Sequence, residues 1–399
     1  MAMMKKEQNQ KRDGVILKEG REKSLLFKHP WVFSGAIQKI PSCELGQVLP
    51  VYSAQGKFLG SGFCNPKSQI TVRMISFDET NFQDEIKNKI LNAINFRRQL
   101  FEGKKTSAYR LINAEGDGLS GLIVDRYEDV LVLQISATGM ERLKPLILET
   151  LIAALNPSWI YEKSTSPSRK EEGLKPEEKT LYGKEKKEVQ IQENGHLFNV
   201  SVIDGQKTGF FLDHRNMRNL IKGFSKEKRV LNVFSYTGGF SIYALSGGAS
   251  SVDSVDVSKD AVNKVTEHIE LNGFSAHKHN EFADDAFHFL KENPLNYDFV
   301  ILDPPAFAKR KNDVNQAARA YKEINRQAFL KMPKNSYLLT SSCSYHVDEP
   351  LFQKIIFSAA LDAKRDVRII SRHILAEDHP QSIYHPEGIY LKSLFCYLS

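Results

Sequence analysis

The pattern of apolar and polar positions changes character at about residue 191. Beyond it, short apolar runs alternate with segments whose apolar residues recur every three to four positions, which predicts strands alternating with helices. The predicted strands are residues 229–233, 251–255, a short one near 280, 298–302, 336–340, 367–372 and 389–398; the predicted helices start at 239 or span 259–272, 286–293, 315–332 and 349–365. This order is typical of an open α/β sheet, with the last two strands closing it as an antiparallel pair.

The front of the chain has a different pattern, in which short strands are separated by Gly, Pro, Ser and Asn. The predicted strands are residues 15–17, 31–33, 46–49, 58–59 and 69–74, which together suit a small β-barrel or sandwich. Residues 81–103 have a helical period. Residues 109–161 read as strand, strand, helix and strand, with the helix at 141–155. The polar, Lys/Glu-rich stretch 163–188 is predicted to be an exposed loop.

Composition narrows the class of protein. A chain of 399 residues with 41% hydrophobic and 26% charged residues is typical of a globular protein of two or three domains. Residues 1–14 are polar and basic, unlike a signal peptide, and no run of about 18 apolar residues predicts a membrane span. Four scattered cysteines without a C-x-x-C pair argue against a metal site or a disulfide framework, and for the cytoplasm.

The net charge of +7 is unevenly distributed. Residues 1–80 and residues 303–335 each carry an excess of five positive charges, so the remainder is slightly acidic. Local basic surfaces of this kind suit a polyanion such as nucleic acid. Ordinary solvation of a surface explains them equally well, and charge alone leaves the two interpretations open.

Two strand ends carry reactive side chains. The apolar strand 298–302 ends in Asp303, Pro304 and Pro305, and the apolar run 336–340 is followed by two serines and Cys343. Parallel strands of an open sheet deliver such groups to one edge, where α/β proteins place their active sites. A carboxylate beside a thiol predicts covalent chemistry on a heterocycle, provided that a cofactor site lies next to them.

The cofactor site is predicted where the strand 229–233 runs through a glycine-containing turn into a helix. Gly238 and Gly239 allow backbone N–H groups to approach a ligand, and Asp256, 18 residues after Gly238, ends the next strand where a carboxylate can accept ribose hydroxyls. The chain lacks G-x-G-x-x-G, which favours a smaller nucleoside cofactor over a dinucleotide. Asp285 ends the third strand and is a candidate for the adenine edge; alternatively, Asp284 or Asp285 caps the next helix.

Several motifs together resemble those of one family. They occupy residues 20–26, 29–36, 207–215, 234–240, 303–307, 342–344 and 379–391. Over nearly the whole chain, this combination resembles the bacterial RlmI-type 23S rRNA cytosine-5 methyltransferases. The resemblance implies an α/β protein with an RNA-binding PUA-type β-barrel at 1–79, a small central α+β domain and linker at 80–190, and a Rossmann-like class I methyltransferase domain at 191–399.

The resemblance also implies a cofactor, S-adenosylmethionine, and the residues around it. It places the methionine part near 234–238, Asp256 on the ribose, Asp303 between cofactor and base, and the segment 207–215 over the cofactor. The full set of expected cofactor contacts is Phe210, Asp213, Arg215, Phe234, Ser235, Tyr236, Thr237, Gly238, Asp256, Asp285, Asp303 and Pro304. Without the resemblance, residues 213–215 read as a surface ion pair.

The predicted chemistry is methylation of cytosine C5. A thiolate that adds to C6 breaks the aromaticity of the ring and makes C5 nucleophilic. Cys343 is the expected nucleophile, and Asp303 is expected to hydrogen-bond the N3/N4 edge. Related RNA enzymes of another group have a second cysteine after the proline pair; here that position is Ala306, which leaves Cys343 to act alone. Cys396 is assigned to the core.

The expected substrate is 23S ribosomal RNA, with a homodimer as a candidate assembly. The basic residues Lys309, Arg310 and Lys311 would hold phosphates beside the pocket. Trp31, in the predicted β-barrel, would provide a further contact with the RNA. Phe307 and Tyr345 either stack on a flipped base or pack in the fold. Two other functions remain open: methylation of a purine nitrogen with Cys343 as a bystander, and a non-catalytic RNA-binding assembly factor.

Overall fold

A computed structural model describes residues 13–399. The amino-terminal residues on which the signal-peptide prediction rests lie largely outside this range. The described residues divide into two compact units: the first holds residues 13–189, Val200–Phe210 and Glu377–Gly388, and the second holds Gln190–Asn199, Phe211–Ala376 and Ile389–Ser399. Among the described residues, no helix combines the length and the apolar character that a membrane crossing needs.

The first unit begins with a small β module. Its strands are β1 (Val15–Leu17), β2 (Trp31–Phe33), β3 (Ile37–Lys39), β4 (Gln47–Tyr52), β5 (Phe58–Cys64) and β6 (Ile70–Ser76), with short helices α1 (Lys23–Leu26) and η1 (Ser34–Ala36). The sheet order is β2-β6-β5-β4-β1-β3. Its core is built from inward-facing residues such as Leu17, Val51 and Val72, all fully buried.

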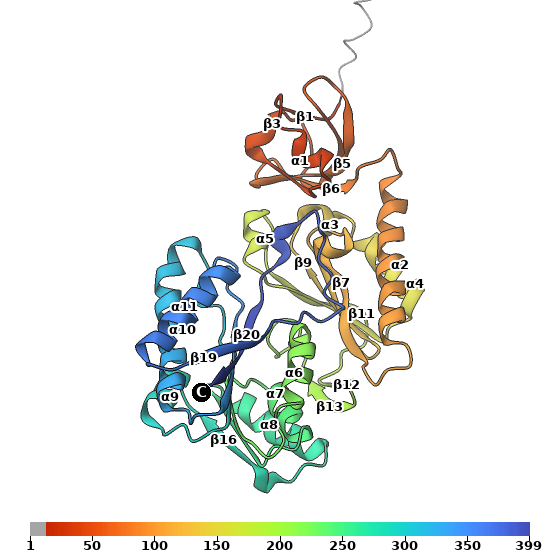
Figure 1. Cartoon of the computed structure of the whole chain (residues 1–399). Coiled ribbons are helices and arrows are strands. Elements are labelled where there is room, and N and C mark those ends of the chain that lie inside the picture. The colour runs from red at the N-terminus through yellow and green to blue at the C-terminus, as the bar shows by residue number, and fades with distance from the viewer. Residues whose placement is uncertain (1–12) are drawn as a thin grey trace, which may run out of the picture. The chain divides into compact units, whose positions relative to one another are not determined.

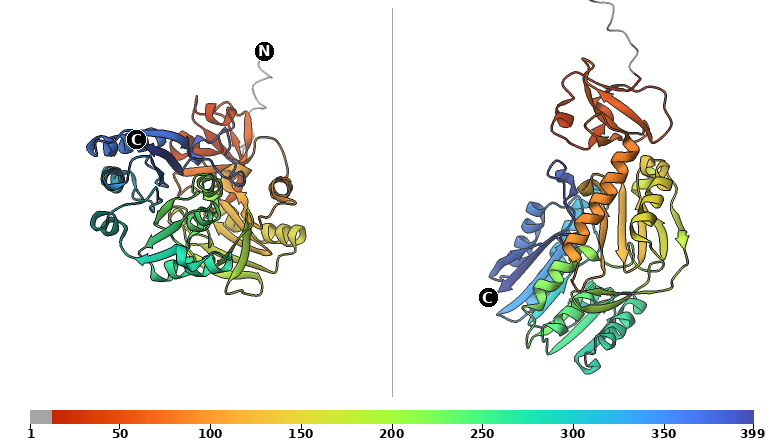
Figure 2. Two further views of the ribbon diagram at one scale, coloured as in Figure 1. Left: turned by 60° about the horizontal axis from the view of Figure 1, so that its bottom comes forward. Right: turned by 90° about the vertical axis from the view of Figure 1, so that its right-hand side faces the viewer.

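A second sheet of the first unit has the order β11-β10-β9-β8-β7. Its elements are α2 (Phe82–Phe101), β7 (Ala108–Asn113), η2 (Ala114–Asp117), β8 (Leu122–Tyr127), β9 (Val130–Ile135), α3 (Thr138–Arg142), α4 (Lys144–Leu155), β10 (Trp159–Ser164), α5 (Ser168–Glu171) and β11 (Glu177–Gly183). Asn81 caps α2 by accepting from two backbone N–H groups. The long helix α2 runs beside α4 along this sheet, and Ile86 and Ile90 share its core (Figures 1 and 2).

Two predictions for this region were wrong. Three strands rather than two precede the helical segment, and the stretch 163–188 is not all loop. Within that stretch, β11 pairs antiparallel with β10 along its whole length. Its side chains are exposed or half-buried, as in an edge strand, so its sequence lacks the apolar residues by which a buried strand is recognised.

The second unit is built on a seven-stranded sheet, within the described residues, of order β16-β15-β14-β17-β18-β20-β19. Its elements are β14 (Arg229–Val233), α7 (Gly239–Ser246), β15 (Ser251–Asp256), α8 (Lys259–Leu271), η4 (Ala276–Lys278), β16 (His279–Ala283), α9 (Ala286–Glu292), β17 (Phe299–Leu302), η5 (Lys311–Asp313), α10 (Val314–Lys331), β18 (Ser336–Ser342), α11 (Glu349–Asp362), β19 (Val367–Arg372) and β20 (Lys392–Leu398). Helices α7 and α8, with α6 (Arg215–Lys222), cover one face and α9 to α11 the other (Figure 1). Four more elements complete the described part of the chain: β12 (Val189–Glu193), β13 (His196–Val200), η3 (Leu212–His214) and η6 (Pro386–Gly388).

The order of these strands positions the site. The neighbouring pairs from β16 to β18 are parallel, whereas β20 runs antiparallel to both β18 and β19, which confirms the predicted closing pair. The four residues of β17 are fully buried, because helices cover both faces of the sheet. From β14 the chain continues outward through β15 to β16, and it then returns to place β17 on the other side of β14. The strand order therefore reverses between β14 and β17, and such a point is where open α/β sheets bind their ligands.

Candidate functional site

The strand ends of β17 and β18 bring the predicted acid and thiol to one edge. The two strands are parallel neighbours with Leu302 opposite Thr340, so Asp303 and Cys343 leave the sheet in the same direction. The Cys343 thiol donates a long hydrogen bond of 3.8 Å from Sγ to the carbonyl oxygen of Pro304. A half-buried thiol therefore lies against the loop that carries the carboxylate, as expected from the two sequence segments.

A histidine that sequence reasoning did not single out completes this arrangement. Nε2 of His214 lies 3.2 Å from Oδ2 of Asp303, and the histidine side chain is buried. Its ring packs edge-on against Phe240 and His373. An Nε2–H that donates to the carboxylate fixes the direction in which Asp303 points, and a fixed direction matters for a group that must meet a reacting base.

The turn after β14 has an unusual backbone. Phe234, Tyr236 and Gly238 all have positive φ angles, of 61°, 46° and 80°. The Asp256 carboxylate holds this turn, because Oδ2 accepts the backbone N–H of Tyr236 at 2.9 Å and Oδ1 accepts that of Ser258 at 3.0 Å. Non-glycine residues in this conformation are uncommon and cluster at ligand sites.

Polar groups at the same turn have unused hydrogen-bonding capacity that a ligand could fill. The buried hydroxyl oxygen of Ser235 has no hydrogen-bond partner among the described residues. Each oxygen of Asp256 has a second lone pair beyond the one used by the backbone, which is what two ribose hydroxyls need. The carbonyl oxygen of Thr237 is hydrogen-bonded to Nδ1 of His268, which lies 2.8 Å away. These features fit a nucleoside cofactor such as S-adenosylmethionine.

The segment 211–215 lies beside this turn. The ring of Phe211 meets that of Tyr236 edge-on, with centroids 5.3 Å apart. Asp213 accepts the phenol of Tyr390 at 2.5 Å, and Arg215 forms an ion pair with Glu193. Because residues 213–215 are all buried, the alternative of a surface ion pair is wrong. Cofactor contacts of Asp213 and Arg215 stay predictions.

Phe210 falls in the first unit rather than with the rest of this segment. Its backbone N–H donates to the phenol oxygen of Tyr127 at 3.2 Å, and its side chain is buried. Its proposed contact with the cofactor likewise stays a prediction.

Asp285 is the N-cap of α9. One oxygen of its carboxylate accepts the backbone N–H groups of Phe287 and His288, both at 3.0 Å. Asp284 instead accepts from the side chain of His288 and from the backbone of Asp285. The capping alternative for Asp285 thus has direct structural support, while its contact with adenine stays a prediction.

Two aromatic residues beside the reactive pair differ in their surroundings. Phe307 packs against Tyr321 and Phe287, with ring centroids 4.7 and 5.9 Å away, which is the packing alternative. Tyr345, two residues after Cys343, is 52% exposed and suits a stacking role. The basic run 309–311 is exposed and follows Asp303 in the same loop.

Trp31 is held inside the first unit. Its indole N–H donates to Glu115 at 3.0 Å, Arg73 lies over its ring, and His385 packs 4.3 Å away. The neighbouring Phe33 is 46% exposed. Contact of Trp31 with RNA stays a prediction, and this geometry favours a packing role for it.

The four cysteines are free, and burial sets Cys64 and Cys396 apart from half-buried Cys43 and Cys343. Burial raises the pKa of Cys396 to about 12, and burial together with Cys43 raises that of Cys64 to about 12. Thiols with such pKa values stay protonated at neutral pH and are poor nucleophiles.

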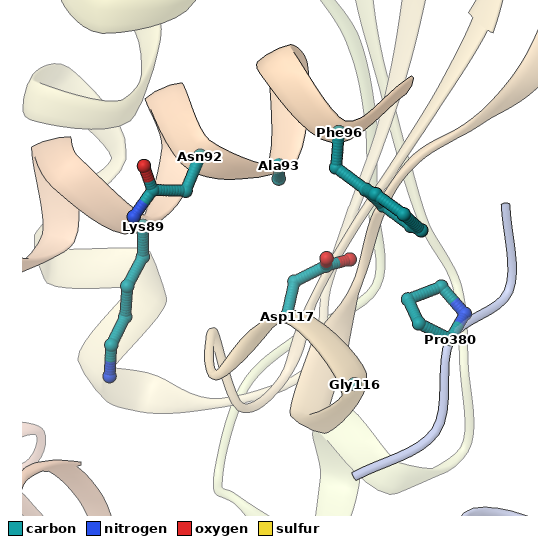
Figure 3. Close-up of a pocket in the computed structure, with 7 residues that line it drawn as sticks. All are labelled: Lys89, Asn92, Ala93, Phe96, Gly116, Asp117 and Pro380. Carbon is teal, nitrogen blue, oxygen red and sulfur yellow. The ribbon is translucent and has the colours of Figure 1, made fainter. Parts of the chain in front are cut away.

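The first unit has two further features that gather polar side chains. A pocket is lined by Lys89, Asn92, Ala93, Phe96, Gly116, Asp117 and Pro380, with Phe96 and Pro380 pointing toward each other (Figure 3). Arg97 occupies both oxygens of Asp117. A cluster of Glu141, Glu162 and Glu177 could hold a metal by spacing, but Lys144 and Arg169 neutralise it.

Comparison with known proteins places this geometry among methyltransferases. A model of S-adenosylmethionine-dependent methyltransferases matches residues 140–344, and a PUA-like domain model matches residues 15–77. Proteins named ribosomal RNA large subunit methyltransferase I from Aliivibrio fischeri (strain MJ11) and Vibrio cholerae are 42% and 43% identical, over 96% of this chain and 98% of theirs.

The solved structures agree. The crystal structure of SMU.776, a putative methyltransferase complexed with SAH, is 26% identical with a TM-score of 0.83, and the match covers 96% of this chain and 99% of that one. A putative SAM-dependent methyltransferase from Streptococcus mutans matches with a TM-score of 0.82, 27% identity and the same coverage.

Proposed function

The chain belongs to the ribosomal RNA large subunit methyltransferase I family of S-adenosylmethionine-dependent enzymes, and we propose that it methylates C5 of a cytosine through a covalent bond between Cys343 and C6. The substrate is 23S rRNA, and the protein acts in the cytoplasm. The observation that carries the proposal is the thiol of Cys343 against the loop of Asp303, at the ends of two neighbouring strands.

The turn after β14 and Asp256 form the proposed cofactor site. Asp256 binds the ribose hydroxyls, and residues 234–238 line the methionine part. S-adenosylmethionine supplies an electrophilic methyl group when bound. Ser235 supports this assignment, because its buried hydroxyl lacks a partner within the described residues.

The reaction follows from the thiol and the acid. The Cys343 thiolate adds to C6 of the cytosine, which breaks the aromaticity of the ring and makes C5 a nucleophile for the methyl group. Asp303, oriented by His214, hydrogen-bonds the N3/N4 edge and stabilises the ring while the thiolate adds. Loss of the C5 proton then expels the thiolate and restores the enzyme.

A base inside a helix cannot reach this thiol, so the target cytosine is flipped out or already unpaired. Exposed Tyr345 stacks on it, and the basic residues 309–311 hold the adjoining phosphates. The PUA-like module supplies additional contacts with RNA.

A mechanism-based substrate tests the proposal. RNA that carries 5-fluorocytosine at the target cannot lose its C5 substituent as a proton, so the enzyme should remain bonded to it through Cys343. We expect a protein–RNA adduct that survives denaturing electrophoresis, and its complete loss in Cys343→Ala. Cys396→Ser, at the buried thiol, is the matched control and should still form the adduct.

Two outcomes contradict the proposal. Methylation of a purine nitrogen needs no thiol, so activity retained in Cys343→Ala without an adduct would reveal that chemistry. A non-catalytic RNA-binding protein should not bind S-adenosylmethionine, and calorimetric titration detects this directly.

A further inference from the structure

A buried lysine lies next to the proposed nucleophile. Lys392 begins β20, opposite Ser342 of β18, and its side chain is 3% exposed. Its Nζ donates to the carbonyl oxygens of Ser344 and Tyr390, both at 2.7 Å. Cys343 lies between Ser342, which pairs with Lys392 across the ladder, and Ser344, whose carbonyl oxygen accepts a hydrogen bond from the Lys392 ammonium. Strand pairing therefore holds a cation at the backbone that carries the thiol.

The ionisation of this lysine is finely balanced. Burial lowers the pKa of Lys392 to about 8, while an ionised Cys343, and secondarily Asp348, raise it. Asp348 is the N-cap of α11, where its carboxylate accepts the N–H of Leu351 at 2.8 Å. A negative charge on Cys343 is thus the main favourable electrostatic partner of the Lys392 ammonium.

The other groups near this pair come from four elements and are already engaged. Tyr321 of α10 hydrogen-bonds the hydroxyl of Ser344 at 2.9 Å, and burial foremost, with the charge of Cys343, raises the pKa of its phenol. Asp303, after β17, is paired with His214 of η3. His373, after β19, contacts the hydroxyl of Ser393. Lys392 is therefore a buried cation placed to act on Cys343.

We propose that the Lys392 ammonium stabilises the thiolate of Cys343, so that the resting enzyme holds a nucleophile ready to attack. The inference rests on the proposed function, in which Cys343 attacks C6. Lys392 is a positioning residue that acts through the thiol. The same charge stabilises the thiolate twice: before attack, and again as the leaving group when the methylated base is released.

The protonation of Cys343 can be followed in the full chain without RNA. The rate of alkylation by iodoacetamide reports the thiolate, and mass spectrometry of peptides separates Cys343 from half-buried Cys43, which serves as an internal reference. We expect half-maximal reactivity of Cys343 at least one pH unit below the ordinary thiol value of about 8.5. In Lys392→Met the midpoint should rise by at least one unit, with roughly tenfold slower alkylation at pH 7.

Two further variants separate charge from structure. Lys392→Arg keeps the positive charge and should return the midpoint toward the wild-type value. Lys331→Met removes another ammonium of the same unit that is held by backbone carbonyls, those of Leu290, Lys291 and Asn293, and should leave the Cys343 profile unchanged.

Either of two results overturns the inference: a wild-type midpoint at the ordinary thiol value, which needs no variant to fold, or an unchanged midpoint in a folded Lys392→Met. The 5-fluorocytosine adduct separates this inference from the proposed function. A low midpoint without an adduct supports the ion pair and refutes the C6 mechanism, whereas an adduct with an ordinary midpoint refutes only the role of Lys392.

Discussion

At the scale of single residues, the buried charge of Lys392 has a cost in folding free energy. Its pKa of about 8 in the folded protein lies below the ordinary lysine value of about 10.4 that the unfolded chain has. Between these two values the unfolded chain binds more protons than the folded one, so stability increases as pH rises. Below pH 8 both states are protonated, and the folded state is at its largest disadvantage.

This linkage predicts the pH dependence of local stability. From pH 8 to 10.4 the wild-type protein should gain up to about 3 kcal/mol from this residue, a gain that Lys392→Met should lack. Both tryptophans, Trp31 and Trp159, lie in the first unit, so hydrogen exchange of peptides from β18 and β20 is the suitable measurement. Parallel pH profiles of the two proteins would contradict the prediction.

The residues of the site differ in how readily sequence reasoning finds them. Asp303 and Cys343 each follow an apolar run, so a strand end could be predicted locally. No sequence pattern next to His214 or Lys392 indicates that these polar side chains are buried. They are buried only because their segments pack against parts of the chain that are distant in sequence. Sequence reasoning can identify a side chain whose position follows from its own strand. It misses a side chain whose position depends on packing against another segment of the chain.

At the scale of elements, the turn from β14 into α7 depends on one glycine. Gly238 has φ of +80°, and a Cβ added there would lie 2.6 Å from Cγ1 of Val265 in α8. Gly273, after α8, has a similar φ of +71° but nothing within 4 Å of an added Cβ. An alanine at either position would therefore be strained in its backbone, but only an alanine at 238 would also clash with a neighbouring side chain.

We expect Gly238→Ala to lose about 3 kcal/mol of stability and at least tenfold in affinity for S-adenosylmethionine, because α7 must move away from Val265 and take residues 234–238 with it. Gly273→Ala carries only the backbone term, about 1 kcal/mol, and should bind normally. Hydrogen exchange of β14 peptides and calorimetric titration measure the two effects. Equal losses in both variants would show that packing at Val265 is unimportant.

The elements that the sequence predicts best are those that carry apolar residues of their own, whether buried like β14 or largely exposed like β19. Strands such as β14 and β19 were predicted with their observed bounds, and β17 within one residue. The edge strand β11 was missed, because its order comes from backbone pairing with β10 while its Glu- and Lys-rich side chains remain in solvent. Backbone pairing with a neighbouring strand does not depend on side-chain type, so it leaves no pattern in the strand's own sequence.

At the scale of the whole molecule, the first unit is completed by a late segment of the chain. Residues 377–388 lie in sequence between β19 and β20 of the second unit, yet they belong to the first. Fully buried Asp378 anchors them: Oδ2 accepts the backbone N–H of Arg110 at 2.7 Å, and its carbonyl accepts Nη2 of Arg97 at 2.8 Å. No local pattern in the sequence indicates that this segment leaves the α/β part of the chain.

The anchor predicts that the first unit loses stability when Asp378 is changed. Asp378→Ala leaves the N–H of Arg110 without its acceptor inside the unit, which should cost about 2 kcal/mol. Asp129→Ala is the matched control, because Asp129 forms an exposed ion pair with Lys186 in the same unit and should cost less than about 1 kcal/mol. Tryptophan fluorescence during urea unfolding follows the first unit, while hydrogen exchange of β14 follows the second and should be unaffected. If Asp378→Ala costs no more than Asp129→Ala, the late segment does not stabilise the unit that it joins.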